Sequence, residues 1–304
     1  MEHAAAHEGT GEKRRATLYV VATPIGNLGD ISHRALEILG SVDAVAAEDT
    51  RVTRQLLARF GIAKRLIAVH EHNEKRVAKQ VLALLAEGRS LALTCDAGTP
   101  AISDPGALLV AAARHAGFPV TPVPGPNAAI AALSASGLAA PHFLFYGFLP
   151  ERTAARRRAL GALAKLPFTL VFFEAPHRVA ESIADLRAVL GGDRHVVLAR
   201  ELTKLFETVH DCTLAEAEAW LAADPHRRKG EFVLIVECAS AEPALENAGR
   251  RALEVLLAEL PLKQAVSLAA RIAGGGKNEL YRLALTMRKK ALPFTIHRSP
   301  FTKL

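Results

Sequence analysis

Three loops rich in glycine and proline, each following a short apolar run, carry the residues of this chain that are best placed to do chemistry. They are TPIGNLGD (Thr23 to Asp30), CDAGTPAISDPG (Cys95 to Gly106) and PVPGPNAA (Pro122 to Ala129). Glycine lets a backbone come close to a ligand, and proline fixes a loop so that less entropy is lost on binding. Because main-chain N–H and C=O groups suit a small polar ligand, we expect the three loops to form walls of one site.

The apolar runs before these loops predict buried strands at 18–22, 90–94 and 119–123. In open α/β sheets, ligands bind at the carboxyl ends of the strands, where these loops begin. Two more strands and five helices alternate with them and predict a five-strand α/β domain over residues 17–124. The strands are expected at 43–47 and 66–69, and the helices at 31–39, about 50–60, 75–87, 106–116 and 127–136.

The second half of the chain predicts a second α/β domain over residues 125–240. Its strands, at 143–146, 169–174, 196–203 and 231–237, are expected to form a smaller sheet, with an Arg-rich helix near 153–164 and a helix ending at Leu190. A polar stretch, Ser240 to Asn247, predicts a linker. Residues 245–290 then show a helix-turn-helix pattern around Gly274 to Gly276, with inner positions Ala265, Leu268, Ala269, Ile272, Leu280, Tyr281 and Leu283. Residues 1–16 and 291–304 are expected to be tails, the first disordered.

Charge is spread unevenly along the chain, whose net charge is +7. Residues 142–304 hold 24 of the 38 Lys and Arg but only 18 of the 31 Asp and Glu. An anionic macromolecule such as nucleic acid would explain this excess, although a solvated basic surface would too. No apolar run approaches the roughly 20 residues of a membrane helix. The start of the sequence shows no secretory signal, so we expect a cytoplasmic protein without a membrane partner.

Several kinds of chemistry are disfavoured because their motifs are missing. The sequence contains no dinucleotide-binding G-x-G-x-x-G after its first strand, no P-loop and no G-x-S-x-G. His70 and His72 could share one face, but no third ligand stands out, so no metal is expected. The three cysteines are far apart and predict free thiols. Asp96 suits either a general base or an Asx turn, and the sequence does not separate the two.

Nine ordered motifs closely resemble the RsmI family, the bacterial 16S rRNA (cytidine-2′-O)-methyltransferases of the tetrapyrrole methylase superfamily. The resemblance extends from about Leu18 to Leu285. The motifs are TPIGNLGDIS, AAEDTR, HEHNE, DAGTPAISDPG, PGPNA, GFLP, EAPHR, RELTK and RRKGEFVLIVE. The resemblance implies two α/β domains of the tetrapyrrole methylase type, with a cofactor cleft between them and a C-terminal helix-turn-helix module. It also implies a homodimer whose substrate is 16S rRNA in the small ribosomal subunit, methylated at a cytidine in the decoding region.

The same resemblance implies that S-adenosylmethionine binds in the cleft. The residues expected to hold it are Pro24, Ile25, Gly26, Asn27, Asp96, Ala97, Gly98, Thr99, Ser103, Pro124, Gly125, Pro126, Asn127, Phe173, Glu174 and Ala175. Methyl transfer to a ribose hydroxyl needs the hydroxyl to be aligned and its proton accepted. Asp49, Glu174 and Lys204 are the candidates for this role, although Asp49 with Arg51 and Glu201 with Lys204 could equally be plain ion pairs. Substrate binding is expected at Arg51, His72, Asn73, Arg156, Arg157, Arg178 and Lys277.

Two other functions remain open at this point. The first is methylation of a tetrapyrrole, which the basic second half and the helix-turn-helix pattern disfavour. The second is a non-enzymatic RNA-binding protein that uses the cleft to sense a metabolite, because such a protein would have the same charge and loops.

Overall fold

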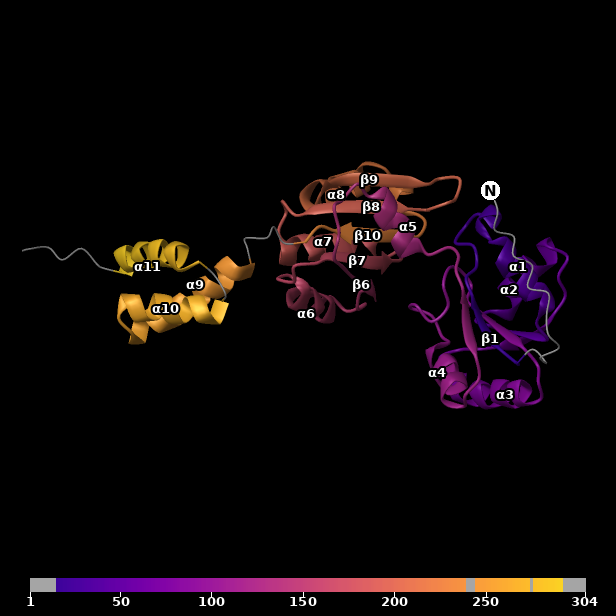
Figure 1. The fold of residues 1–304 in the computed structure, drawn as a ribbon. Coiled ribbons are helices and arrows are strands. Elements are labelled where there is room, and N and C mark those ends of the chain that lie inside the picture. The colour runs from indigo at the N-terminus through magenta and orange to yellow at the C-terminus, as the bar shows by residue number, and fades with distance from the viewer. Residues whose placement is uncertain (1–14, 239–243, 274–275, 292–304) are drawn as a thin grey trace, which may run out of the picture. The chain divides into compact units, whose positions relative to one another are not determined.

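The computed structural model describes residues 15–238, 244–273 and 276–291. Contacts divide the chain into two compact units, Met1–Glu237 and Cys238–Leu304, and each is described here by itself. The first unit holds two five-stranded sheets, and the second holds three helices (Figure 1). No described helix is both long enough and apolar enough to cross a membrane.

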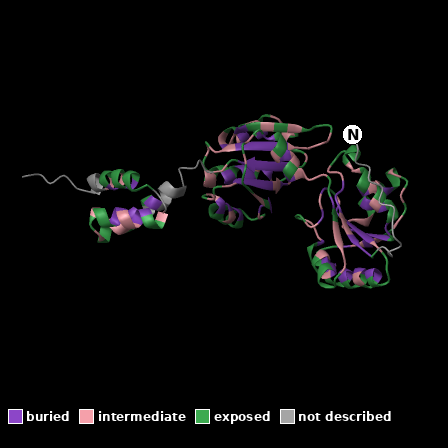
Figure 2. Ribbon diagram, in the orientation of Figure 1, coloured by how far each residue is buried: buried purple, intermediate pink, exposed green. Residues whose placement is uncertain are grey.

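The first sheet is parallel throughout. Its strand order is β3 (Arg65–Ala68), β2 (Ala44–Ala47), β4 (Leu91–Thr94), β1 (Leu18–Val21) and β5 (Val120–Val123). Every residue of β2 and β4 is buried, which explains why their sequences read as continuous apolar runs (Figure 2). The carboxyl ends of β1, β4 and β5 lie side by side at one edge, as the three Gly/Pro loops predicted.

Helices cover both faces of this sheet. Leu39 of α1 (His33–Ser41) and Leu57 of α2 (Thr50–Arg59) share a buried cluster with Val45 of β2. The opposite face packs against α3 (Glu74–Ala86) and α4 (Ala107–His115). Between β1 and α1 lies one 3-10 turn, η1 (Leu28–Asp30). The five strands and these four helices agree with the sequence prediction to within a few residues.

The second sheet is mixed. Its order is β6 (Phe143–Phe148), β7 (Thr169–Glu174), β10 (Phe232–Val236), β8 (His195–Arg200) and β9 (Thr208–Thr213), with only β6 and β7 parallel. Side chains alternate between its faces. Val196 and Leu198 face α6 (Thr153–Leu163), α7 (Val179–Leu190) and α8 (Leu214–Ala223), whereas Val197 and Ala199 face α5 (Ala128–Ala135). A second 3-10 turn, η2 (Pro225–Arg228), follows α8.

Three features of the second sheet differ from prediction. The sheet is not smaller than the first, because β9 adds a fifth strand that the sequence did not reveal. Strand β9, TVHDCT, is an edge strand with one partner and one buried residue, so its sequence has no apolar run. Helix α8 is largely alanine and glutamate and was also missed. The strand expected to reach Thr203 ends at Arg200, because Glu201 and Thr203 adopt left-handed backbone angles (φ 51° and 66°).

The C-terminal unit contains α9 (Ala244–Glu259), α10 (Leu262–Ala273) and α11 (Lys277–Ala291). Its core includes Ala265, Ala269 and Leu280, as predicted, together with Leu253 and Ala284.

Two predicted features of this unit are wrong. Ile272 and Tyr281 are exposed rather than inner positions. Helix α9 begins inside the predicted linker, so residues 244–247 are helical, while residues 240–243 lie outside the described part of the chain. Most of both expected tails, residues 1–14 and 292–304, also lies outside it, whereas Ala16 is buried in the first core.

Candidate functional site

The three Gly/Pro loops are bonded to one another at the carboxyl edge of the first sheet. Thr23 and Gly98 exchange backbone hydrogen bonds, with N···O distances of 2.8 and 3.0 Å. The Thr99 hydroxyl donates to the carbonyl of Pro126 at 3.1 Å, and Asn127 donates to the Thr99 hydroxyl at 3.4 Å. Gly98 has φ +90°, which favours glycine at this junction. The loops therefore form one continuous wall.

A cavity of about 360 Å³ lies against this wall and is closed by the second sheet. This volume is within the range of small-molecule sites. The cavity is lined by Ile25, Glu48, Asp96, Ala97, Gly98, Thr99, Ile102, Ser103, Asp104, Asn127, Ala128, Phe148, Phe173, Glu174, Ala175, Pro176, Ala199, Leu202, Lys204, Glu231, Phe232 and Val233.

Ten of the residues expected to bind the cofactor line this cavity. They are Ile25, Asp96, Ala97, Gly98, Thr99, Ser103, Asn127, Phe173, Glu174 and Ala175. The other six, Pro24, Gly26, Asn27, Pro124, Gly125 and Pro126, do not line it. Two of these six contact other residues of the loops and strands that form the wall. The Pro126 carbonyl accepts a hydrogen bond from the Thr99 hydroxyl, and a Cβ on Gly125 would lie 3.0 Å from the Ala22 Cβ.

Lys204, which follows β8 of the second sheet, packs against Gly26 of the first loop. A Cβ on Gly26 would lie 2.5 Å from the Lys204 Cγ, so only glycine fits there without displacing the lysine. The Lys204 Nζ bonds to carboxylate oxygens of Glu201 and Glu231, each at 2.8 Å. Burial opposes the charge of Lys204, but the two ion pairs outweigh it and raise the pKa. Lys204 is therefore a fixed cation that can orient a ligand, and it is a poor proton acceptor.

Three carboxylic acids share the other side of the cavity. Burial raises the pKa of Glu48, Asp96 and Asp104 above their ordinary values, and the charge of a neighbouring carboxylate, which for Asp96 is Asp49, adds to each shift. Glu48 accepts a hydrogen bond from the Asp96 backbone N–H at 3.3 Å. Carboxylates with raised pKa values in a cavity are typical of functional sites. Sequence reasoning missed Glu48 and Asp104, although Glu48 directly follows β2 in the motif AAEDTR and Asp104 lies in the motif DAGTPAISDPG after β4.

Asp49, a candidate for accepting the proton, does not line the cavity. Its carboxylate caps α2 by accepting from the Arg51 N–H at 2.8 Å, and it also pairs with the Arg51 guanidinium at 2.6 Å. Hydrogen bonds from Arg51 hold the pKa of Asp49 well below its usual value. A carboxylate of such low basicity is a weak proton acceptor, so the geometry favours the ion-pair alternative for Asp49 and Arg51.

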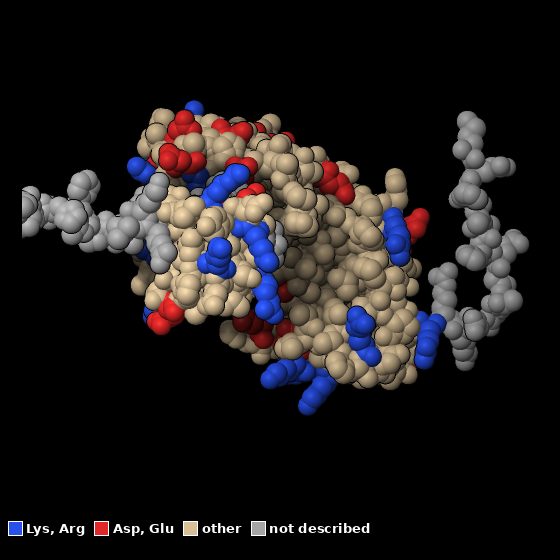
Figure 3. Space-filling model, turned by 60° about the vertical axis from the view of Figure 1, so that its left-hand side comes forward, with Lys and Arg blue, Asp and Glu red and all other residues tan. Residues whose placement is uncertain are grey.

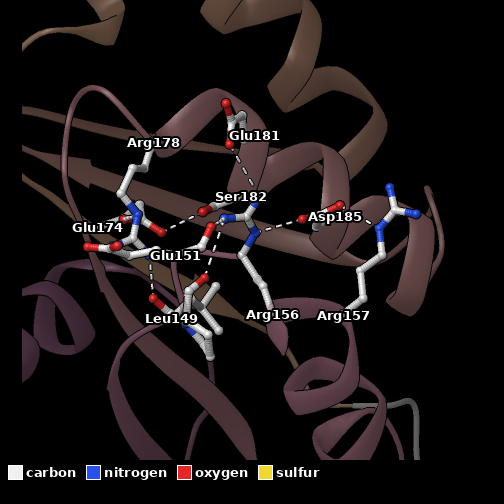
Figure 4. A network of polar contacts seen from close by, with 10 residues as sticks. Leu149, Glu151, Arg156, Arg157, Glu174, Arg178, Glu181, Ser182 and Asp185 are labelled. Carbon is white, nitrogen blue, oxygen red and sulfur yellow. Dashed lines mark hydrogen bonds and ion pairs between the residues drawn. The ribbon is translucent and has the colours of Figure 1, made fainter. Parts of the chain in front are cut away.

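Glu174 lines the cavity, but its carboxylate is fully buried and belongs to a polar network on the α7 side of the second sheet (Figure 4). It accepts hydrogen bonds from Ser182 at 2.5 Å and from the Ala175 N–H at 2.9 Å, and it pairs with Arg178 at 3.4 Å. These bonds hold it against α7. The expected catalytic role of Glu174 stays a prediction.

Three of the four arginines expected to bind substrate, Arg178, Arg156 and Arg157, lie in the same network or beside it. The Arg178 guanidinium donates to the carbonyl of Leu149. Arg156 is buried and donates to Asp185 at 2.6 Å and to the carbonyl of Glu151 at 3.0 Å, so it is not available to bind RNA (Figure 4). Arg157 also pairs with Asp185 at 2.6 Å but is half exposed.

Of the remaining expected substrate residues, Arg51, His72 and Asn73 do not line the cavity, and Lys277 belongs to the C-terminal unit. Arg51, His72 and Lys277 are exposed. The Asn73 side chain is committed to the chain itself, because it accepts from the His70 N–H at 2.8 Å and donates to the Ala68 carbonyl at 3.2 Å. On the face shown in Figure 3, the Lys and Arg side chains lie in groups rather than evenly spread.

The described residues offer no cluster suited to metal ligation, and their three cysteines are unpaired. Within them, no group of three or more His, Cys, Asp or Glu side chains is arranged to hold a metal ion. Cys95, Cys212 and Cys238 are free thiols, as predicted.

Comparison with known proteins shows similarity over both units of the chain. Residues 17–218 match the family model described as Tetrapyrrole (Corrin/Porphyrin) Methylases, and residues 243–288 match the RsmI C-terminal HTH domain.

Several named relatives are similar over most of their length. The Ribosomal RNA small subunit methyltransferase I of Escherichia coli O157:H7 is 53% identical, over 91% of this chain and 97% of its own. The protein of the same name from Xylella fastidiosa (strain Temecula1) is 55% identical, over 87% of this chain and 97% of its own.

Solved structures share the fold at low identity. Diphthine synthase aligns with a TM-score of 0.57 at 16% identity, covering 73% of this chain and 90% of its own. The uroporphyrin-III-C-methyltransferase of Thermus thermophilus aligns with a TM-score of 0.51 at 22% identity, covering 73% of this chain and 94% of its own. Together with the family models, these alignments confirm the predicted fold class of two α/β domains of the tetrapyrrole methylase type with a C-terminal helix-turn-helix module. The family models and the named relatives show that the chain is a methyltransferase and belongs to the ribosomal RNA small subunit methyltransferase I family of tetrapyrrole methylases.

Proposed function

We propose that this enzyme uses S-adenosylmethionine to methylate the ribose 2′-hydroxyl of a cytidine in the decoding region of 16S rRNA. The observation that carries the proposal is the extent of the similarity, because relatives named as rRNA small subunit methyltransferases match both the cavity-bearing unit and the C-terminal helices. The position and the atom methylated rest on the sequence resemblance to the RsmI family.

The cavity suits S-adenosylmethionine in charge and in shape. The cofactor carries a positive sulfonium and an ammonium group, and Glu48, Asp96 and Asp104 place carboxyl groups around the same space. Main-chain groups of the Asp96 to Thr99 loop can bind the methionine tail and the adenine edge. When bound, S-adenosylmethionine supplies an already activated methyl group, so the protein needs chiefly to position the acceptor.

Positioning and proton removal are assigned to different residues of the cavity. Lys204 is held by two glutamates and can donate to the ribose hydroxyl or to a neighbouring phosphate. Among the three acids, Asp96 is fixed by two hydrogen bonds: its N–H donates to Glu48 at 3.3 Å, and its Oδ1 accepts from the Asp49 N–H at 3.0 Å. The raised pKa of Asp96 makes it a better proton acceptor than Asp49.

Methyl transfer to small ribosomal subunits that lack the modification tests this function. Labelled S-adenosylmethionine supplies the methyl group, and mass spectrometry of nuclease fragments maps the product. A ribose-methylated cytidine is the expected product. If the cofactor binds but no methyl group reaches the subunit, the reaction proposed here is wrong.

A C-terminal truncation separates this function from the tetrapyrrole alternative, which the shared fold keeps open. Removing residues 245–304 should weaken binding to the subunit and flatten its dependence on salt, because basic side chains that contact phosphates would be lost. A tetrapyrrole enzyme should keep its activity without this segment. A non-enzymatic sensor would bind the cofactor and transfer no methyl group in either form.

The cellular compartment, the oligomeric state and the form of the substrate are also part of the proposal. We expect a cytoplasmic homodimer that acts on the assembled small subunit. Analytical ultracentrifugation checks the dimer, and parallel assays on naked 16S rRNA and on intact subunits check the form of the substrate.

A further inference from the structure

Two large apolar side chains at the cavity are unusually exposed. Ile102 is 43% exposed and Phe148 is 52% exposed, yet both line the cavity. Ile102 comes from the loop after β4, and Phe148 ends β6 of the second sheet. The acids Glu48, Asp96 and Asp104 share the cavity with them. The site thus combines a charged part with an apolar part that is open to solvent.

The backbone holds Ile102 in this exposed position. Its neighbours Ala101 and Ser103 have φ values of 64° and 67°, a left-handed conformation that is unfavourable for residues other than glycine. Such residues cost stability and concentrate at ligand sites and other functional positions. The loop therefore pushes an apolar side chain outward despite a cost in stability.

Phe148 is held by different means. Its ring meets the ring of Phe173 edge-on, with centroids 5.7 Å apart and an interplanar angle of 65°. The preceding Gly147 has φ +81° and lies where the pairing of β6 with β7 shifts register. Phe173 thus supports one part of the Phe148 ring, and more than half of the side chain stays exposed.

The two segments touch each other. A Cβ on Gly147 would lie 2.9 Å from the Ser103 Oγ, so the residue before Phe148 contacts the residue after Ile102. Glycine is needed at 147 both for its left-handed angle and for this contact. Ile102 and Phe148 are thereby brought to the same part of the cavity from two different sheets. We call this pair the apolar clamp.

We propose that the apolar clamp holds an unstacked nucleobase of the substrate RNA while its ribose enters the acidic part of the cavity. This inference rests on the proposed function. We expect a ribose in folded RNA to enter this cavity when its nucleotide is turned out of the stack, which exposes both faces of the base. Proteins that bind unstacked bases do so with aromatic side chains, since every base offers a flat π-face.

Alanine substitutions of the clamp test the proposal against matched controls. The variants are Phe148→Ala and Ile102→Ala. Phe143→Ala is the control for the first, because Phe143 begins the same strand, is 42% exposed and does not line the cavity. Leu108→Ala is the control for the second, because Leu108 is 50% exposed on α4 and also lies outside the cavity. Phe148→Trp keeps an aromatic face.

The readouts are the Kd of S-adenosylhomocysteine by calorimetry, kcat/KM for unmodified small subunits, and the melting temperature. We expect each clamp variant to lower kcat/KM roughly 10- to 100-fold, the range found when one stacking side chain is removed from a base. The Kd of S-adenosylhomocysteine should change less than about twofold. Both controls and Phe148→Trp should behave nearly as the wild type.

Two results would overturn the clamp while leaving the proposed function intact. If the Kd of S-adenosylhomocysteine weakens by the same factor as kcat/KM, the side chains hold the cofactor and not a base. If the clamp variants match their controls in kcat/KM, they hold neither. A wild-type enzyme that transfers no methyl group to subunits refutes the proposed function, and the clamp with it.

Discussion

Two adjacent arginines make equally short ion pairs with one carboxylate, and we predict that they contribute very differently to stability. The Nε atoms of Arg156 and Arg157 each lie 2.6 Å from an oxygen of Asp185 (Figure 4). Arg156 is 1% exposed and Arg157 is 55% exposed. Distance alone predicts equal effects of removal, whereas burial predicts unequal ones.

Replacing Arg156 by methionine removes the buried partner of Asp185 and the donor to two backbone carbonyls. Asp185 keeps only its exposed pairing with Arg157, and the carbonyls of Pro150 and Glu151, 3.4 and 3.0 Å from the guanidinium, lose their donor. Breaking a buried pair by removing one partner costs about 3–5 kcal/mol. We take the lower end, about 3 kcal/mol, because Arg157 still faces Asp185.

Replacing Arg157 by methionine removes a pair that is open to water, where screening leaves about 0.2–1 kcal/mol. For a unit of this size, 1 kcal/mol shifts the melting temperature by about 2–4 °C. Arg156→Met should therefore lower it by roughly 6–12 °C, and Arg157→Met by less than about 4 °C.

Thermal unfolding followed by tryptophan fluorescence measures the difference. The only tryptophan of the chain, Trp220, is in α8 and packs against the same core as the helices of this network. Urea unfolding at constant temperature gives the free energy directly. Equal losses for the two variants, or a larger loss for Arg157→Met, would refute the reasoning from burial.

Further predictions concern the acids of the cavity and the residues beside it. Because burial raises the pKa of Glu48, Asp96 and Asp104 above their ordinary values of 4.5, 3.8 and 3.8, these groups ionise later as the pH rises. As the pH rises through the raised pKa values, affinity for S-adenosylmethionine should therefore increase more than affinity for S-adenosylhomocysteine, which lacks the sulfonium charge. Calorimetry at several pH values measures both affinities, and an equal change with pH for the two ligands would contradict this. The same shifts favour the folded state at low pH, and that contribution to stability is lost as the pH rises through the raised pKa values. Gly26→Ala should weaken binding of S-adenosylhomocysteine about tenfold, because the new Cβ displaces Lys204. Gly40→Ala is the control and should leave this binding unchanged, because Gly40 has open space around it. Equal Kd values for the two variants would exclude the contact between residue 26 and Lys204. Cys95, which is buried and whose pKa burial raises, should resist alkylation by iodoacetamide until the protein unfolds, and mass spectrometry that finds it modified in the native protein would disprove this.

The sequence by itself determined the first sheet and the location of the site. Parallel strands buried on both faces must be apolar throughout, so β2 and β4 stand out as short runs of Ala, Val, Leu and Thr. The site follows from the same rule, because loops after neighbouring parallel strands meet at one edge. Edge strand β9 carried no comparable signal, since a strand with one partner and one buried residue can be largely polar.

The roles of individual charged residues were decided only by the tertiary structure. Arg156 and Arg157 are adjacent in the sequence and identical in type, yet one is buried against α7 and the other reaches solvent. Asp49 and Glu48 are adjacent as well, and only Glu48 lines the cavity. What a carboxylate or guanidinium does depends on its burial and on its partners, and for Arg156 the partner is Asp185, 29 residues further along the chain. Such contacts cannot be predicted from composition and spacing, because they form only when the sheets and helices pack.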